Sequence, residues 1–201
     1  MFDALLRPLI DPPLNRAGRA AAGLGLSANA VTLTGMAIGI AAGFAIAHGH
    51  FAAGLALIIV NRLCDGVDGA IARATHKSDF GGYLDIVCDF VFYVSVPLGF
   101  GWAAGANALP ALVLVAAFTL TGTSFLAYAI LAEKAGATTS AHGEKSFFYN
   151  TGLAEGAETI AVFVAMTLFP AWFAPIAYGY AALCTLTVVQ RTLGVRRAFR
   201  S

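Results

Sequence analysis

Long apolar stretches occupy most of this chain of 201 residues. Each is close to the roughly 20 residues that an α-helix needs to cross a hydrocarbon core about 30 Å thick. They lie near residues 28–47, 51–73, 80–102, 108–131, 151–169 and 173–193. Only 11% of all residues are charged, whereas a soluble domain would carry about a quarter, so the lipid bilayer is the expected solvent. We therefore expect an all-α integral membrane protein with six transmembrane helices.

The distribution of Lys and Arg predicts the orientation of these spans. Basic residues precede the first span, follow the last one, and occupy the second and fourth breaks, while the first, third and fifth breaks contain none. Because basic loops stay in the cytoplasm, we expect a multi-pass protein of a bacterial inner membrane, with both termini on the cytoplasmic side. No linker divides the chain, so residues 1–201 are expected to form a single domain.

One feature precedes the first span and another lies within it. Residues 1–26 mix leucines with arginines, which predicts an interfacial amphipathic helix, kept short by Pro8, Pro12 and Pro13. The first span carries glycines at every fourth position, which predicts a close approach of another helix, either within the monomer or from a second copy. The net charge of +1, without a basic stripe, gives no sign of nucleic-acid binding.

Four aspartates lie inside the second and third spans, where a carboxylate is costly unless it faces a cavity or a partner. Asp65 and Asp68 are three residues apart, and Asp85 and Asp89 are four apart, so each pair projects from one helix face. The two spans are joined by a short turn, and both pairs lie at similar distances from it. We therefore expect all four carboxylates to converge near the cytoplasmic surface.

Oxygen ligands of this kind suit Mg²⁺, Mn²⁺ or Ca²⁺ rather than a soft metal. Two such ions could stabilise the attacking and the leaving oxygen of a phosphoryl-type displacement. The structural alternative is a network of ion pairs that only joins two helices. Arg62 and Arg73 cannot neutralise four carboxylates, which favours metal binding.

The residues around these aspartates form a longer motif. Asp65-Gly-Val-Asp-Gly-Ala-Ile-Ala-Arg73 is followed by Gly81-Gly-Tyr-Leu-Asp-Ile-Val-Cys-Asp89. This motif closely resembles the D-x2-D-G-x2-A-R…G-x3-D-x3-D signature of the CDP-alcohol phosphotransferase (CDP-alcohol phosphatidyltransferase) family, in all eight defined positions. The gap over residues 74–80 is one residue shorter than in the family pattern, which concerns loop contacts rather than the metal site.

The resemblance implies an enzyme of phospholipid biosynthesis that transfers a phosphatidyl group from CDP-diacylglycerol to a small alcohol and releases CMP. It also implies a homodimer and a pair of Mg²⁺ or Mn²⁺ ions, with Asp89 as the general base. The implied metal ligands are Asp65, Asp68, Asp85 and Asp89. The residues implied to contact the cytidine nucleotide and its diphosphate are Asp65, Gly69, Ala72, Arg73 and Gly81.

Five further residues are candidates for the acceptor pocket: Arg62, Lys145, Glu155, Glu158 and Arg191. The two glutamates, three residues apart in the fifth span, could bind hydroxyl or ammonium groups of the acceptor. They could equally pair with one of the three basic residues. Because acidic side chains would repel a phosphorylated acceptor, this pattern favours an amino alcohol or an uncharged polyol over inositol phosphate or glycerol phosphate.

Other functions are compatible with some of these features. CDP-diacylglycerol is the expected donor because a shallow site meets a lipid from the bilayer and a polar acceptor from the cytoplasm, but a soluble CDP-alcohol with a lipid acceptor is the inverted alternative. A carboxylate-lined metal-ion transporter would also need intramembrane aspartates, yet not Gly69, Ala72 and Arg73 at fixed offsets. A structural scaffold would explain no intramembrane charge.

Overall fold

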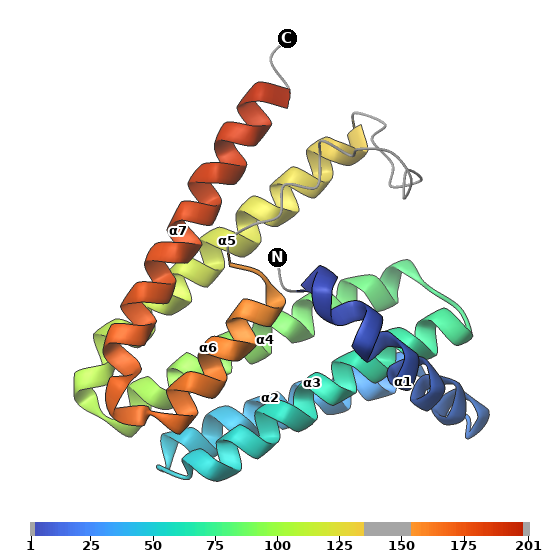
Figure 1. Ribbon diagram of the computed structural model, residues 1–201, viewed down its shortest axis with the longest axis horizontal. Helices are drawn as coiled ribbons and strands as arrows, with labels where there is room; N and C mark the ends of the chain where they lie inside the picture. Colours follow the sequence, from blue (N-terminus) through green and yellow to red (C-terminus); the bar gives the residue numbers. More distant parts are fainter. Residues whose placement is uncertain (1–2, 135–153, 199–201) are drawn as a thin grey trace.

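The computed structural model describes residues 3–134 and 154–198, and every regular element in these ranges is a helix (Figure 1). The α-helices are α1 (Asp3–Gly23), α2 (Ala28–Ala47), α3 (Phe51–Ala74), α4 (Asp79–Ala103), α5 (Ala108–Lys134), α6 (Gly156–Leu168) and α7 (Phe173–Ala198). Two 3₁₀ helices, η1 (Gly105–Asn107) and η2 (Pro170–Trp172), lead into α5 and α7. The expected all-α class is confirmed.

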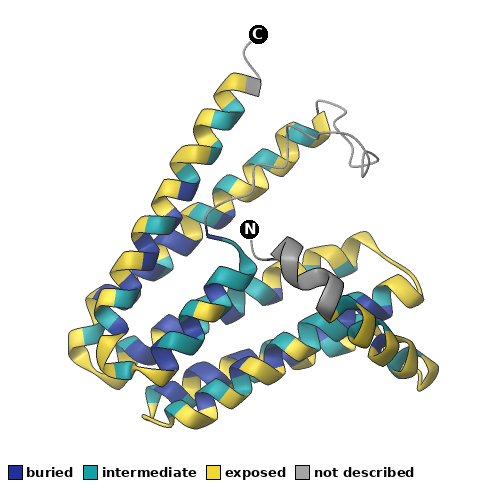
Figure 2. Ribbon diagram, in the orientation of Figure 1, coloured by how far each residue is buried: buried dark blue, intermediate teal, exposed yellow. Residues whose placement is uncertain are grey.

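Within the described ranges, four helices are long and apolar enough to cross a membrane. They span Ala28–Ala47, Asp79–Ala103, Gly105–Lys134 and Pro170–Arg197. Only 28–33% of each apolar window is buried inside the protein, and exposed positions run along these helices (Figure 2). Large apolar side chains such as Phe44 and Trp102 are among the exposed ones. Apolar surface of this extent marks a lipid-facing exterior.

The two remaining expected spans depart from that description. Helix α3 has 24 residues, which is long enough, but it carries Arg62, Asp65, Asp68 and Arg73. Helix α6 has only 13 residues and begins at Gly156, later than the expected start at residue 151. Just before α6, the backbone N–H of Ala154 donates to Thr187 Oγ1 of α7 at 3.0 Å, so this N–H bonds to a neighbouring helix instead of joining a longer α6.

The expectation of a short N-terminal helix is wrong, because α1 extends over 21 residues and passes through its prolines. Pro12 and Pro13 are exposed. Packing on α3 holds the helix. A Cβ on Gly18 would come within 2.5 Å of Ala70 Cβ, and one on Gly66 would come within 2.6 Å of Leu14 Cδ1. These close contacts outweigh the local effect of proline.

Helix α2 lies between α3 and α4 and packs along both of them (Figure 1). Its three spaced glycines make these contacts possible. A Cβ on Gly35 would lie 3.1 Å from Cys64 Cβ of α3, and one on Gly39 would lie 2.9 Å from the Phe92 ring of α4. The glycines at every fourth position therefore serve helix contacts within the monomer, which is one of the two alternatives that the sequence left open.

Helices α3 and α4 are held together mainly through α2. The short turn after Ala74 joins them, and each packs mainly on α2. Farther along α4, Phe92 contacts Phe163 of α6 and Phe100 stacks on Phe173 of α7, with ring centroids 5.6 and 4.5 Å apart. The end of α4 near the turn is thus left open beside α2 and α3.

Candidate functional site

The four motif aspartates line one small cavity at this open end. Asp65 and Asp68 reach it from α3, and Asp85 and Asp89 from α4. The start of α4 is set by Ser78, whose Oγ accepts a hydrogen bond from the Gly81 N–H at 3.0 Å. The free space in the cavity is ≈ 10 Å³, about one water-sized sphere, which suits a bare ion better than a substrate.

Three of the carboxylates fit a divalent cation by their spacing. One oxygen from each of Asp65, Asp68 and Asp85 lies within 4.8 Å of the others. Oxygens that bind one ion at about 2.0–2.6 Å can be at most about 4–5 Å apart, so the three can share an ion. Asp89 lines the same cavity but lies outside this group of three.

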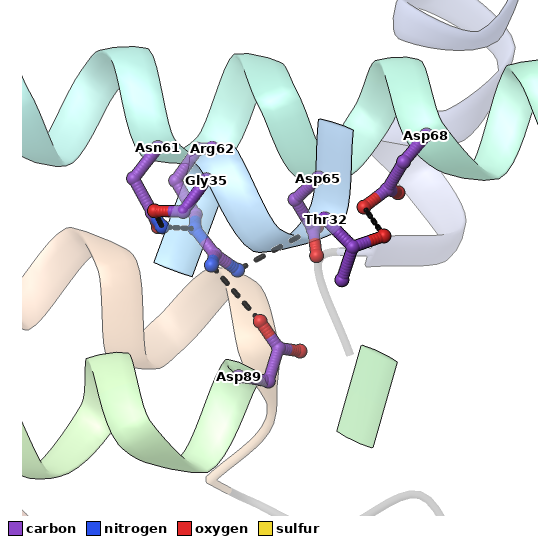
Figure 3. A network of polar contacts seen from close by, with 7 residues as sticks. All are labelled: Thr32, Gly35, Asn61, Arg62, Asp65, Asp68 and Asp89. Atoms are coloured by element: carbon purple, nitrogen blue, oxygen red, sulfur yellow. Dashed lines mark hydrogen bonds and ion pairs between the residues drawn. The ribbon is translucent and has the colours of Figure 1, made fainter. Parts of the chain in front are cut away.

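A chain of polar contacts surrounds the cavity (Figure 3). Arg62 donates from Nη2 to Asp89 Oδ1 at 2.9 Å, and its Nη1 lies 3.5 Å from Asp65 Oδ2. On the other side, Thr32 of α2 donates to Asp68 Oδ2 at 2.6 Å. Asp68 is 5% exposed, so this hydroxyl fixes a carboxylate that has little contact with solvent.

Replacing Thr32 with valine is expected to weaken Mn²⁺ binding about tenfold, because a group that orients a metal ligand typically contributes that much. Valine keeps the shape of the side chain but cannot donate to Asp68. Thr34→Val is the matched control, since the Thr34 hydroxyl is exposed and donates to Ala30 O in its own helix. Titration of the purified variants with Mn²⁺ by electron paramagnetic resonance checks this prediction. Equal affinity of the two variants would contradict it.

A second, larger cavity of ≈ 280 Å³ adjoins the first. Thr32, Asp68 and Asp85 line both cavities. The larger one is also lined by the motif residues Gly69, Ala72, Arg73 and Gly81 and by His76, Lys77 and Ser78 from the turn. Small residues on two helices and basic groups at the mouth make a space that suits a charged, elongated ligand.

Arg73 is held at the edge of this larger cavity by α1. Its Nη2 and Nε donate to Asn15 Oδ1 at 3.0 and 3.3 Å. Its Nη1 lies on the other side, 3.3 Å from where a Cβ on Gly69 would stand. Asn15 therefore accepts hydrogen bonds from one edge of the guanidinium group, and the other edge is directed toward the cavity.

Among the described acceptor-pocket candidates, one lines the small cavity and the others lie elsewhere on α6 and α7 or directly before α6. Arg62 lines the small cavity, whereas Glu155, Glu158 and Arg191 are absent from its lining among the described residues. Arg191 donates to Thr121 O and to Ser124 Oγ of α5 at 3.0 and 2.5 Å. Glu155 occupies the N-cap position of α6 without a side-chain capping hydrogen bond, and Glu158 lies in the first turn of this helix. Lys145 lies outside the described residues.

Sequence reasoning did not assign Thr32, Asn15 or Asn61 to the site. Asn61 is 3% exposed and donates to Gly35 O of α2 at 2.7 Å. A signal for Asn61 existed, since a polar residue directly before Arg62 in an apolar span is costly without a partner. Asn15 gave no comparable signal, because it lies in a polar segment that is distant in sequence.

Fold and site together define an all-helical membrane protein with a carboxylate cluster beside a larger cavity. The family model described as CDP-alcohol phosphatidyltransferase matches residues 26–191. The inner membrane protein YnjF of Escherichia coli (strain K12) is 46% identical over 192 residues, with 95% of this chain and 93% of YnjF covered. Archaetidylinositol phosphate synthase of Pyrococcus horikoshii is 32% identical over 197 residues, with 96% of this chain and 95% of that enzyme covered.

Solved structures share the fold. Phosphatidylinositol phosphate synthase (PgsA1) of Mycobacterium tuberculosis with CDP-DAG bound has a TM-score of 0.67 at 24% identity, with 91% of this chain and 93% of that chain covered. The same enzyme in complex with manganese and citrate has a TM-score of 0.65 at 22% identity, with 90% and 88% covered. The chain belongs to the CDP-alcohol phosphatidyltransferase family. It is an enzyme, a membrane transferase of phospholipid biosynthesis.

Proposed function

We propose that this enzyme transfers a phosphatidyl group from CDP-diacylglycerol to a hydroxyl group of a small polar alcohol and releases CMP. The observation that carries the proposal is the contact between the two cavities, one lined by the four motif aspartates and the other by motif residues with small side chains and by Arg73. A neighbour in fold was solved with CDP-DAG bound, which supports a lipid donor. Membership of an enzyme family favours this function over the metal-ion transporter.

Each residue of the site then has a role. Asp65, Asp68 and Asp85 hold a divalent ion, Mg²⁺ or Mn²⁺, which when bound neutralises charge on the diphosphate. Arg73 donates to phosphate oxygens, and Gly69 leaves room for them. The acceptor oxygen attacks the β-phosphorus, the bond from that phosphorus to the CMP oxygen breaks, and Asp89 takes the hydroxyl proton.

The proposal includes the arrangement in the membrane. Helices α3 and α6 complete six spans with the four apolar ones, α1 lies at the membrane surface, and the whole chain forms one domain, as a homodimer, with both termini and the site on the cytoplasmic side. The distribution of Lys and Arg supports this orientation, and so does the relative from the E. coli inner membrane. Accessibility of single cysteines to a membrane-impermeant reagent in intact cells tests it.

An acceptor screen tests the reaction. Purified protein with Mn²⁺ receives CDP-diacylglycerol labelled in its acyl chains together with an amino alcohol, an uncharged polyol or inositol phosphate, the last because two relatives are archaetidylinositol phosphate synthases. A second arm offers a soluble CDP-alcohol with diacylglycerol. Acceptor-dependent CMP release with a new labelled lipid supports the proposal. Turnover only in the second arm would reverse donor and acceptor, and CMP release that persists in Asp68→Asn protein would refute the assigned site.

Replacing Asn15 with alanine is expected to raise KM for the CDP-linked donor about fivefold, because a hydrogen bond to a charged group at an exposed position contributes about 1 kcal/mol. The value of kcat should stay near that of the wild type, since Asn15 acts only through Arg73. Ala17→Ser, an exposed change on the same helix, is the control. Steady-state kinetics with varied donor checks this, and a lower kcat at unchanged KM would contradict it.

A further inference from the structure

Tyr93 lies one helical turn beyond Asp89 on the same face of α4. Long side chains of a helix lean toward its N-terminus, so the ring of Tyr93 leans back toward Asp89. The ring centre lies 5.8 Å from the guanidinium carbon of Arg62, and the hydroxyl interacts electrostatically with both Asp89 and Arg62. Tyr93 is therefore a neighbour of the residue that is proposed to take the acceptor proton.

The ring of Tyr93 is held by its neighbours, but its hydroxyl is not. The ring contacts Phe118 of α5 and Phe163 of α6, with centroids 6.0 and 6.4 Å apart. Within the described part of the chain, no residue forms a hydrogen bond with the hydroxyl, and the side chain is only partly buried. A tyrosine in apolar surroundings normally finds a partner for its hydroxyl. A polar group of a bound ligand can supply that partner.

The two cavities divide the four aspartates. Asp68 and Asp85 line both cavities, whereas Asp65 and Asp89, as far as the structure describes the linings, belong to the small one alone. A donor in the larger cavity therefore reaches the cluster from the side of Asp68 and Asp85. The side of Asp89 and Tyr93 is left for the acceptor.

Two hydroxyl groups from α6 and α7 lie beyond Tyr93. Tyr180 Oη is 2.7 Å from Thr159 Oγ1, and the Tyr93 hydroxyl interacts electrostatically with Tyr180. The guanidinium group of Arg62 beside the Tyr93 ring disfavours an ammonium group of a ligand at this place. A hydroxyl group of a ligand avoids that repulsion, and it can both donate to a phenol and accept from it.

We infer that Tyr93 is a specificity-determining residue for the acceptor: its hydroxyl hydrogen-bonds a second hydroxyl group of the alcohol whose reacting hydroxyl faces Asp89. The acceptor is then a polyhydroxyl alcohol rather than an amino alcohol with a single hydroxyl. The inference rests on the proposed function and deepens it, because it places the acceptor on the α6 side of the aspartates. Tyr93 was not among the acceptor-pocket candidates of the sequence.

Tyr93→Phe removes the hydroxyl and keeps the ring. With glycerol or inositol phosphate as the varied acceptor, its KM should rise about fivefold, which is the effect of one neutral hydrogen bond. The KM for the donor and kcat should stay near the wild-type values, a separation that a mere loss of packing would not give. Tyr83→Phe is the matched control, because Tyr83 is 63% exposed on the same helix and is absent from the described linings of both cavities.

A fluorotyrosine at position 93 of the otherwise native protein reports the contact without turnover. In the presence of Mn²⁺, its ¹⁹F NMR signal should shift on titration with glycerol or inositol phosphate and stay in place with ethanolamine. The inference is overturned if neither polyhydroxyl probe shifts the signal, if ethanolamine shifts it as strongly, or if Tyr93→Phe leaves the acceptor KM unchanged. A shift without CMP release from any acceptor would refute the proposed function alone.

Discussion

Replacing Asp89 with asparagine is expected to lower kcat for CMP release about 10²- to 10⁴-fold, the usual contribution of a general base. Asparagine has nearly the shape of aspartate and can still contact Arg62, but it cannot take the proton of the acceptor hydroxyl. Because Asp89 is held by Arg62 at 2.9 Å, the substitution should leave the helix packing and the KM for the donor largely unchanged. Steady-state kinetics with saturating donor and acceptor measures this.

Asp79→Asn is the matched control for this variant. Asp79 lies in the first turn of the same helix and is exposed, so its replacement removes the same charge away from both cavities. Its kcat should be that of the wild type. An Asp89→Asn enzyme that keeps more than about a tenth of the wild-type kcat would contradict the role of Asp89 as the base.

Replacing Gly43 with valine is expected to lower the melting temperature of the purified protein by about 5–10 °C, as overpacking of a core costs about 1–3 kcal/mol. At this position the backbones of α2 and α4 touch. A Cβ on Gly43 would collide with the Ser95 carbonyl, and one on Gly99 would collide with the Gly43 carbonyl. A side chain here must push α4 away from α2, so Mn²⁺ affinity should fall as well.

Gly179→Val provides the control for this prediction, because Gly179 is also inside a helix but a Cβ there would meet nothing within 4 Å. Both variants lose the same glycine backbone freedom and gain the same β-branched side chain. Thermal unfolding followed in detergent should therefore separate them. Equal melting temperatures for the two variants would mean that the contact of α2 with α4 does not hold the site together.

The sequence predicted those parts of the molecule that depend on one helix at a time. Apolar length predicted α2 as Ala28–Ala47 without error, and α3 and α4 to within a residue at each end. The spacing within each aspartate pair predicted a shared helix face, and the structure places all four carboxylates on one cavity. Spacing of three or four residues along a helix is local information, which a single sequence carries in full.

Contacts between distant segments could not be predicted in the same way. Nothing in the sequence indicates that α2 lies between α3 and α4. Nothing indicates either that the Arg62 guanidinium group lies closer to the Asp89 carboxylate than to that of Asp65. The length of α1 was not predicted, because close packing of Gly18 on α3 outweighs the helix-breaking effect of proline. Family resemblance supplied roles for motif residues but none for Asn15 or Thr32, whose contacts the three-dimensional arrangement provides.

The central claim is that aspartates from α3 and α4 hold a divalent ion beside the larger cavity. Anomalous diffraction from crystals grown with Mn²⁺ tests it most directly. The expected result is a peak about 2.0–2.6 Å from carboxylate oxygens of Asp65, Asp68 and Asp85. A peak located away from these three side chains, or carboxylates turned toward lipid, would contradict it.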